Sequence, residues 1–432
     1  MIKILSVIFT IVVTSFYFFP FEFTFLPGVN TKMAMAGLGL VILGIQLGKS
    51  RDSLIGKDFF VLSIFALAVS LISFIAVSLN DTYDYTYVSY VISMWVWLGG
   101  AYVVISLIRK VHNVASVEFV CHYLIAVCVA QCVIAMLMDS LPSVKAFVDS
   151  FLGGTEGYMG KNESRLYGIG AALDVAGTRF SAALVMIAYL MVKNNENGYK
   201  FRRLLYIISF LIIAIVGNMM ARTTTLGVIL SLLYWVYVSE IYKLNMSSKY
   251  TYIWRWFLGA MIVGLPVLVY LYLNNQNFYE NIRFGFEGFF SLAETGSWEV
   301  SSNDILKNMY VFPDNLKTWV IGDGYIVNPK DDLYYTGPIF NGYYMGTDVG
   351  YLRFIFYFGL IGLIAFISYI YKSANICIQR FGRWKDLFVL FLLINFVVWF
   401  KVATDIFLVF AIFMCVNKDE NEQYDTLVES KA

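Results

Sequence analysis

The sequence predicts an all-α membrane protein that crosses the bilayer many times. Of its 432 residues, 59% are hydrophobic, 18% are aromatic and only 14% are charged, and the mean hydropathy is +0.69. A soluble domain carries about 25% charged residues, so this composition excludes a single soluble domain. Apolar runs recur along the chain, and about 20 apolar residues in a helix cross the hydrocarbon core of a bilayer. The formal net charge is +1, and no block of like charge indicates nucleic-acid binding.

The apolar runs predict the transmembrane helices in order. Ten of them have roughly the 17 to 25 residues that one span needs, and they cover residues 4–19, 33–47, 59–79, 87–108, 117–138, 168–192, 204–220, 223–242, 253–273 and 349–371. A last run, 387–416, is interrupted by Lys401 and Asp405, so it is either one long tilted helix or two short antiparallel ones. We favour two, which gives about twelve transmembrane helices, with eleven as the alternative.

Lysine and arginine collect in alternate connections between these runs. The basic connections are residues 49–57, 109–110, 193–203, 243–255 and 372–385. Because cytoplasmic loops carry an excess of lysine and arginine, this side is predicted to be cytoplasmic, with the N-terminus inside. The first run ends in Phe-Pro-Phe-Glu-Phe rather than in small residues, so it is expected to be an uncleaved span rather than a signal peptide.

The longest polar segment, residues 274–347, follows the ninth run and is predicted to lie on the external side of the membrane. It contains four basic residues against nine aspartates or glutamates. Apolar residues at helical spacing predict an amphipathic helix over 278–289, and capping residues and a proline predict two more, over 302–312 and 313–322. We expect a compact helical lid without a strand core. The predicted organisation is a bundle of nine spans over 1–273, the lid over 274–347, three further spans over 348–417 and a polar tail over 418–432.

Arginines on the outer half of the bundle are the candidate binding residues. Arg165 precedes the sixth run, Arg222 lies between the seventh and eighth, and Arg353 lies one helical turn inside the tenth. Arg179 lies deeper, five residues after Asp174. An unpaired arginine in a bilayer costs at least ~2.5–3.5 kcal/mol on insertion scales, so these side chains should face a wet cavity or an anion. Two alternatives stay open: Asp174 and Arg179 form an internal ion pair, and Arg222 anchors a helix end.

Several guanidinium groups on one face are suited to a diphosphate. They bind phosphate oxygens bidentately, keep their charge, and would stabilise a departing diphosphate. No metal is expected, because the two histidines, His112 and His122, are both predicted at or near the cytoplasmic side. Asp348, immediately before the tenth run, is the best-placed carboxylate to take a proton from an acceptor hydroxyl. Its alternative role is to cap the helix that follows.

Four segments resemble the superfamily of O-antigen polymerases (Wzy-type) and O-antigen ligases. RTTTL at 222–226 matches an arginine-x-x-x-leucine element of the ligases, and Gly359 and Gly362 match a Gly-x-x-Gly in the span after the long external loop. Further similarity lies in SRLYGIGAALDVAGTRFSAAL at 164–184 and IGDGY at 321–325. The ligases carry a histidine near the end of the loop. This chain has none there and carries an aspartate in its place, which favours a polymerase.

The resemblance implies a metal-independent, inverting glycosyltransferase of the GT-C type. It would join undecaprenyl-diphosphate-linked oligosaccharide repeat units, which serve as donor and acceptor, at the periplasmic face of the bacterial inner membrane. It allows a chain-length regulator protein as a partner beside membrane lipid, and it implies no cofactor and no nucleic acid. An O-antigen ligase and a lipid-linked oligosaccharide flippase or transporter remain the alternatives.

Under this resemblance the predicted site residues take separate roles. Arg165 and Arg222 hold the donor diphosphate, and Asp348 orients or deprotonates the acceptor hydroxyl. The other expected substrate contacts are Arg353, Arg179, Asp174, Tyr325, Tyr343, Tyr344 and Tyr351. The tyrosines would stack on sugar rings, although packing is the alternative role for each of them, because the chain contains 31 tyrosines.

Overall fold

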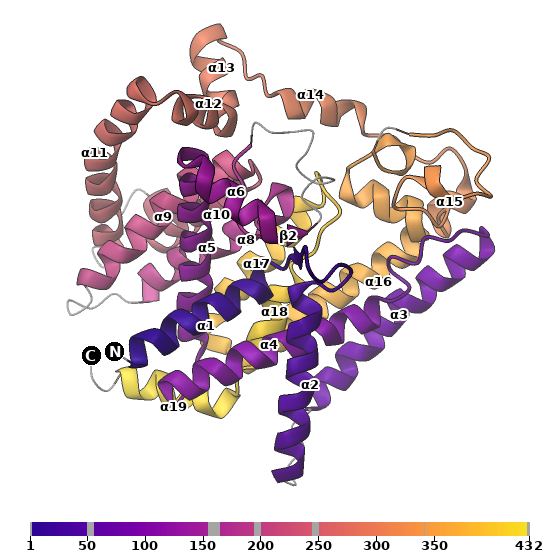
Figure 1. Cartoon of the computed structure of the whole chain (residues 1–432), viewed down its shortest axis with the longest axis horizontal. Coiled ribbons are helices and arrows are strands. Elements are labelled where there is room, and N and C mark those ends of the chain that lie inside the picture. Colours follow the sequence, from indigo (N-terminus) through magenta and orange to yellow (C-terminus); the bar gives the residue numbers. More distant parts are fainter. Residues whose placement is uncertain are drawn as a thin grey trace. The chain divides into compact units, whose positions relative to one another are not determined.

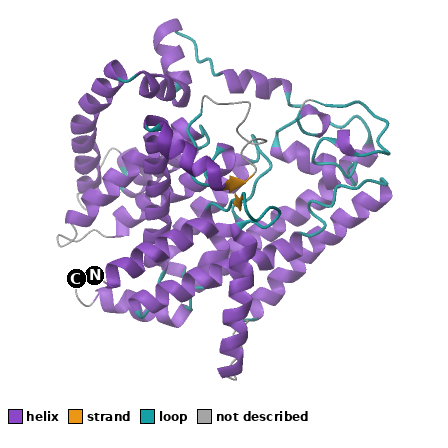
Figure 2. Ribbon diagram, viewed as in Figure 1, coloured by secondary structure: helices purple, strands orange, loops and turns teal. Residues whose placement is uncertain are grey.

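The computed structural model describes residues 2–49, 56–153, 165–193, 200–243, 250–340 and 342–429. The fold is all-α, as predicted, and 77% of it is helical (Figure 1). Figure 2 shows one short antiparallel pair of strands in the described residues, β1 (Glu22–Phe23) with β2 (Leu152–Gly153). Ser164 and parts of the basic connections at 49–57, 193–203 and 243–255 lie outside the described residues, as does the end of the tail from 430.

Seven helices are long and apolar enough to cross a membrane. In the part of the chain that the structure describes, they are α3 (Lys57–Leu79), α4 (Tyr90–His112), α5 (Val117–Ser140), α8 (Leu173–Lys193), α9 (Lys200–Met220), α11 (Thr251–Asn274) and α16 (Gly350–Arg380). Three other predicted runs form shorter apolar helices, α1 (Ile2–Phe18), α2 (Thr31–Lys49) and α10 (Thr224–Val238). Each of the ten predicted runs therefore contains a helix, and the chain has the organisation of a multi-pass membrane protein.

The last apolar run, 387–416, forms two helices rather than one. α17 (Lys385–Val398) and α18 (Phe407–Met414) are separated by residues 399–406, which include Lys401 and Asp405. Asp405 accepts hydrogen bonds from the Tyr90 hydroxyl (3.2 Å) and from the Phe407 amide (2.9 Å). The polar interruption in the sequence is therefore a break between two helices, and Asp405 stabilises the start of the second one.

The helices belong to two compact units. The first comprises Met1–Leu38, Gly100–Gly296 and Ile412–Ala432, and the second comprises Gly39–Gly99 and Ser297–Ala411. The centre of the first unit is α8, because 89% of its apolar stretch is buried and it packs against α5, α9 and α10. Glycine permits the contact with α10, since a Cβ at Gly227 would lie 2.3 Å from the Cα of Ser181. α11 is the opposite case: none of its apolar stretch is buried, which fits a helix that faces lipid.

The second unit is organised around α16, which packs against α3, α15 (Leu316–Val320) and α17. α16 contains a break at Gly359, whose φ of 67° and ψ of −172° lie outside the helical range. The carbonyls of Phe356 and Tyr357 accept hydrogen bonds from the amides of Asp323 (2.6 Å) and Gly324 (3.1 Å). The segment after α15 thus satisfies polar groups that the break exposes, which a helix in a membrane requires.

The described part of residues 274–347 contains the helices α12 to α15, which differ from the predicted ones. α12 (Gln276–Gly285) and α13 (Glu287–Thr295) replace the single helix expected over 278–289, because the chain leaves helical geometry at Phe286 (φ −120°, ψ 28°). α14 (Ser301–Asn308) ends before residue 312, and α15 begins at Leu316 rather than at 313. α12 and α13 belong to the first unit, and α14 and α15 belong to the second.

The polar tail also forms a helix, α19 (Lys418–Glu429), which packs on the first unit. Glu420 lies 3.0 Å from Arg109 Nε at the end of α4, and Asp425 Oδ1 lies 2.8 Å from Lys193 Nζ at the end of α8. These ion pairs make the tail a part of the fold. The remaining helical elements are α6 (Pro142–Phe151) and the 3-10 turns η2 (Ile241–Lys243), η4 (Pro329–Asp331), η5 (Tyr344–Gly346) and η6 (Gly382–Trp384).

Candidate functional site

Arg222 lies in a tight turn between α9 and α10, and polar contacts with α8 fix this turn. Thr223 Oγ1 donates a hydrogen bond to Asp174 Oδ1 (2.6 Å), and Ser181 Oγ donates to the Thr223 carbonyl (2.9 Å). Gly177 leaves room for the turn, because a Cβ there would lie 2.5 Å from Thr223 Oγ1. Asp174 therefore holds the turn that presents Arg222, a structural role that its spacing from Arg179 did not reveal.

The Arg222 side chain is held against α12 and α13. Its Nε donates a hydrogen bond to the Phe284 carbonyl (3.0 Å), and its guanidinium lies 4.3 Å from the centre of the Phe284 ring. Its Nη2 lies 2.7 Å from Oε2 of Glu287, and the side chain is 15% exposed. Burial lowers the pKa of Arg222, and the Glu287 carboxylate opposes this shift. A partly buried cation of this kind is stable only with an anion beside it.

Arg165 approaches the same phenyl ring. Its guanidinium lies 4.8 Å from the centre of the Phe284 ring, so the two predicted arginines share one aromatic side chain. The charge of Arg165 also lowers the pKa of Arg222, as expected for neighbouring cations. The carboxylates of Glu287 and Asp174 both raise the pKa of Arg222, so negative charge lies near the two arginines. Two guanidinium groups on one ring are suited to phosphate oxygens, which they bind bidentately.

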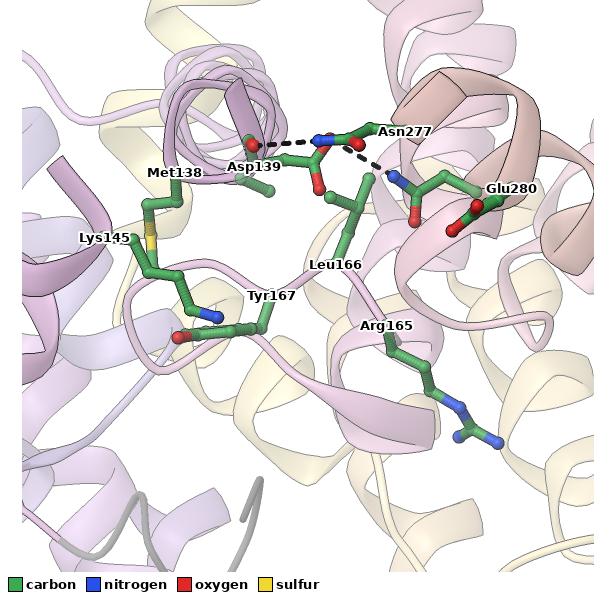
Figure 3. A pocket seen from close by; sticks show the side chains of 10 residues that line it. Met138, Asp139, Lys145, Arg165, Leu166, Tyr167, Asn277 and Glu280 are labelled. Carbon is green, nitrogen blue, oxygen red and sulfur yellow. Dashed lines mark hydrogen bonds between the residues drawn. The ribbon is translucent and has the colours of Figure 1, made fainter. Parts of the chain in front are cut away.

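A cavity of about 220 Å³ lies beside Arg165 in the first unit. Its walls are Ala135, Met138, Asp139, Lys145, Arg165, Leu166, Tyr167, Asn277, Glu280 and Asn281. Figure 3 shows Asp139 next to Asn277, Lys145 beside Tyr167, and the guanidinium of Arg165 pointing away from them. The Asn277 amide nitrogen donates to the Asp139 carbonyl (3.2 Å), and that of Asn281 donates to Asp139 Oδ2 (3.3 Å). α12 is thus tied to the end of α5 at one wall of the cavity.

Asp348 and Arg353 lie in the second unit and form an ion pair, with 3.1 Å between Oδ1 and Nη1. Arg353 also donates to the Ile326 carbonyl (3.3 Å), and its guanidinium lies 3.5 Å from the centre of the Tyr343 ring. The N-cap residue of α16 is Val349, one residue after Asp348, and its side chain makes no capping hydrogen bond. The Asp348 carboxylate turns to the arginine one turn further along the chain, because opposite charges attract strongly at a partly buried site.

The predicted tyrosines of the second unit are engaged by the protein itself. The Tyr325 hydroxyl donates to Asp332 Oδ2 (2.6 Å), and its ring contacts those of Tyr335 and Tyr344. Burial and the Asp332 carboxylate raise the pKa of Tyr325. The Tyr351 hydroxyl donates to the Phe396 carbonyl (3.0 Å), and its ring packs edge-on against that of Trp399. These contacts fit the alternative role of Tyr325 and Tyr351, which is packing within the protein.

The remaining predicted residue, Arg179, is buried in α8. Its guanidinium lies 5.5 Å from the centre of the Phe19 ring and 6.0 Å from that of Phe18. The cation therefore lies against aromatic rings of the first unit, where the negative faces of the rings attract it.

The predicted site residues are divided between the two units. The first unit contains Arg165, Asp174, Arg179 and Arg222, and the second contains Asp348, Arg353 and the tyrosines. Of these residues, the structure brings Arg165 to Arg222 and Asp348 to Arg353. In the described residues, no group of three or more histidine, cysteine, aspartate or glutamate side chains is arranged to hold a metal ion.

Sequence reasoning missed Phe284 and Glu287, which complete the arginine site. Glu287 is one of nine acidic residues in the external segment, and nothing in its spacing distinguishes it from the others. Phe284 lies within an aromatic-rich stretch where the pattern pointed only to an amphipathic helix. Only their position opposite the Arg222 turn identifies these two residues. That position depends on how α12 packs against α9, which the sequence does not show.

The fold and the paired arginines define the class as an all-α, multi-pass membrane protein with a cationic site at the ends of its helices. No family model, no curated protein and no solved structure matches the chain. Its function is therefore argued from the site.

Proposed function

We propose that the protein is a polysaccharide polymerase of the O-antigen type. It would be a glycosyltransferase that joins undecaprenyl-diphosphate-linked oligosaccharide repeat units at the periplasmic face of the bacterial inner membrane. The observation that carries the proposal is the convergence of Arg165 and Arg222 on the Phe284 ring, which brings two guanidinium groups together. A diphosphate on a membrane lipid is an anion that such a site in a multi-pass protein would meet.

The bond changes are those of an inverting transfer. The bond between the anomeric carbon of the donor sugar and the diphosphate oxygen breaks, and the acceptor hydroxyl bonds to that carbon from the opposite face. The diphosphate leaves with an additional negative charge, which the guanidinium groups of Arg165 and Arg222 would stabilise. The proton of the acceptor hydroxyl passes to a carboxylate base. Asp348 is the residue proposed for this role, and within the second unit it pairs with Arg353.

Glu287 fits this proposal as an internal anion that occupies part of the diphosphate site before the donor arrives. Its carboxylate contacts Arg222 at 2.7 Å and is itself 33% exposed, so it can be displaced into solvent. A diphosphate offers more oxygen atoms and more charge to the two arginines than one carboxylate does. Donor binding would therefore exchange a weaker anionic partner of Arg222 for a stronger one.

The proposed arrangement in the membrane follows the sequence. About twelve helices of a GT-C-like fold cross the membrane, the N-terminus is cytoplasmic, and residues 274–347 lie in the periplasm. The donor and the acceptor are both lipid-linked repeat units, and a chain-length regulator protein is the proposed macromolecular partner.

A deletion strain complemented with variants tests the proposal. Arg165→Gln and Arg222→Gln should each abolish the ladder of long surface polysaccharide and leave single repeat units attached to the lipid acceptor. Arg283→Gln is the matched control, because Arg283 lies on the same helix as Phe284 but pairs with the exposed Glu294 at 2.6 Å. Gel analysis of the surface polysaccharide gives the result, and normal ladders from both site variants would refute the diphosphate assignment.

The same strain separates the alternatives. Loss of every attached glycan in the deletion strain would identify a ligase, and loss of repeat units from the external side would identify a flippase. A polymerase alone predicts single attached units.

A further inference from the structure

The cavity beside Arg165 has no role in the diphosphate site described above. Its volume of about 220 Å³ would hold roughly seven water molecules at ~30 Å³ each. That is the scale of one sugar ring with its hydroxyl groups, and it is too small for an oligosaccharide. The cavity lies between the end of α5, the start of α6, residues 165–167 and α12.

The chemistry of the walls suits a polyhydroxylated ligand. Asn277 and Asn281 offer amide groups, Asp139 and Glu280 offer carboxylates, and Lys145 offers an ammonium group. Each sugar hydroxyl both donates and accepts a hydrogen bond, so it needs partners of both kinds, whereas a lipid tail needs an apolar wall. The walls carry two negative charges, from Asp139 and Glu280, and two positive charges, from Lys145 and Arg165, and this balance suits an uncharged sugar.

The polar walls are already held in place without a ligand. The amide nitrogens of Asn277 and Asn281 are used by Asp139, which leaves their amide oxygens as acceptors. Lys145 Nζ lies 5.8 Å from the centre of the Tyr167 ring, and the Tyr167 hydroxyl donates to Asp149 (2.8 Å). A site whose side chains are fixed before binding loses less conformational entropy when its ligand enters.

We propose that this cavity binds the sugar that is joined directly to the diphosphate of the lipid-linked donor, and that this sugar is uncharged. The inference rests on the proposed function, since it takes the ligand of Arg165 and Arg222 to be that diphosphate. Arg165 lines the cavity and also lies on the Phe284 ring with Arg222, so it borders both sites. A sugar one bond away from the diphosphate is the part of the donor that can reach this cavity.

Two ligands distinguish a sugar site from a diphosphate site. Binding to the purified full-length protein is measured for a prenyl diphosphate and for the same prenyl diphosphate carrying one N-acetylhexosamine. Asn277→Leu and Lys145→Leu each remove a polar wall at an exposed position. Each variant should weaken binding of the glycosylated ligand about tenfold, the loss expected for one or two hydrogen bonds, and change binding of the bare ligand less than about twofold.

Controls separate this inference from the proposed function. Asn274→Leu makes the same substitution at an exposed position at the end of α11, where the side chain bonds to the Tyr270 carbonyl (2.8 Å), and it should change neither affinity. Arg222→Gln should weaken the binding of both ligands. Equal losses for both ligands in the two wall variants, or no loss for either, would overturn the sugar site. Unchanged binding of both ligands in Arg222→Gln would overturn the diphosphate site instead.

Discussion

Among the predicted site residues, each unit contains an arginine paired with a carboxylate, and the two pairs differ in what surrounds them. Arg222 with Glu287 lies in a turn between helices, beside a second arginine and a polar cavity. Arg353 with Asp348 lies at the start of α16, where the arginine is 9% exposed and also bonds to a backbone carbonyl. The first pair has a second arginine next to it, whereas the arginine of the second pair is bonded to the backbone and is more deeply buried.

This difference shows that the surroundings of an ion pair indicate its role. A balanced pair that is bonded to the backbone orients its neighbours, and breaking it mainly costs stability. A pair with a second cation beside it has capacity for another anion. We therefore expect Arg222 to bind the ligand and Arg353 to position Asp348. The following substitutions test these roles.

The largest effect is expected from Asp348→Asn. A general base contributes about 10²–10⁴-fold to a rate, so transfer should slow by that factor while donor affinity stays within about twofold. The measurement is polymer formation by purified protein from lipid-linked repeat units. Asp332→Asn is the control, because Asp332 accepts a hydrogen bond from Tyr325 in the same unit and has no proposed catalytic role. A transfer rate within about tenfold of the wild-type rate would contradict the role of general base. Asp348 would then serve only to pair with Arg353.

Gly359→Ala should unfold the second unit more readily, because Gly359 makes the break in α16. Its φ is positive, and a Cβ there would lie 2.2 Å from the Val320 backbone. Left-handed backbone and overpacking together should cost about 2–5 kcal/mol. Gly259→Ala in α11 is the matched control, since its Cβ would meet nothing within 4 Å. Thermal unfolding in detergent compares the two, and equal midpoints would contradict the packing described for α16.

Arg353→Gln should lower stability more than Arg222→Gln does. The Arg353 change removes a charged hydrogen-bond donor from an enclosed pair, at a cost of about 1.5–3 kcal/mol. Arg222 lies near a second arginine, so its loss relieves repulsion with Arg165 while it removes the contact with Glu287. Thermal unfolding midpoints of both variants give the order of their stabilities. A lower midpoint for Arg222→Gln than for Arg353→Gln would contradict the roles given to the two pairs.

The smallest effect is expected from Glu287→Gln. Removing the internal anion frees Arg222 for an added diphosphate, and a partly exposed ion pair is worth up to ~1 kcal/mol, or about fivefold in affinity. Calorimetry with a soluble prenyl diphosphate should show tighter binding, and more so at low salt. Glu294→Gln, which breaks the exposed pair with Arg283, serves as the control. Weaker binding by the Glu287 variant would mean that this carboxylate supports the site.

The break in α16 joins two motifs that are far apart in the sequence. IGDGY at 321–325 supplies the amides that bond to the Phe356 and Tyr357 carbonyls, and Gly359 belongs to the Gly-x-x-Gly of α16. Gly322 fits against the same place, since a Cβ there would lie 2.5 Å from the Tyr357 carbonyl carbon. Both motifs can be read from the sequence, but their contact cannot be predicted from it.

The sequence by itself determined the class of the protein and the position of its helices. Length and apolarity of a run are local properties, so all ten predicted runs contain helices, and the charged interruption at 401–405 marks a break. The end of a helix was harder to predict where neighbours decide it, as at Phe286 between α12 and α13.

Only the tertiary structure decided which charges meet. Arg165, Arg222, Phe284 and Glu287 come from separate places in the chain, and the spacing within any one of them says nothing about the others. The same holds for Asp174, which accepts a hydrogen bond from Thr223, 49 residues further along the chain. Long-range packing brings such groups together, because burying apolar helix faces fixes which polar turns lie opposite one another.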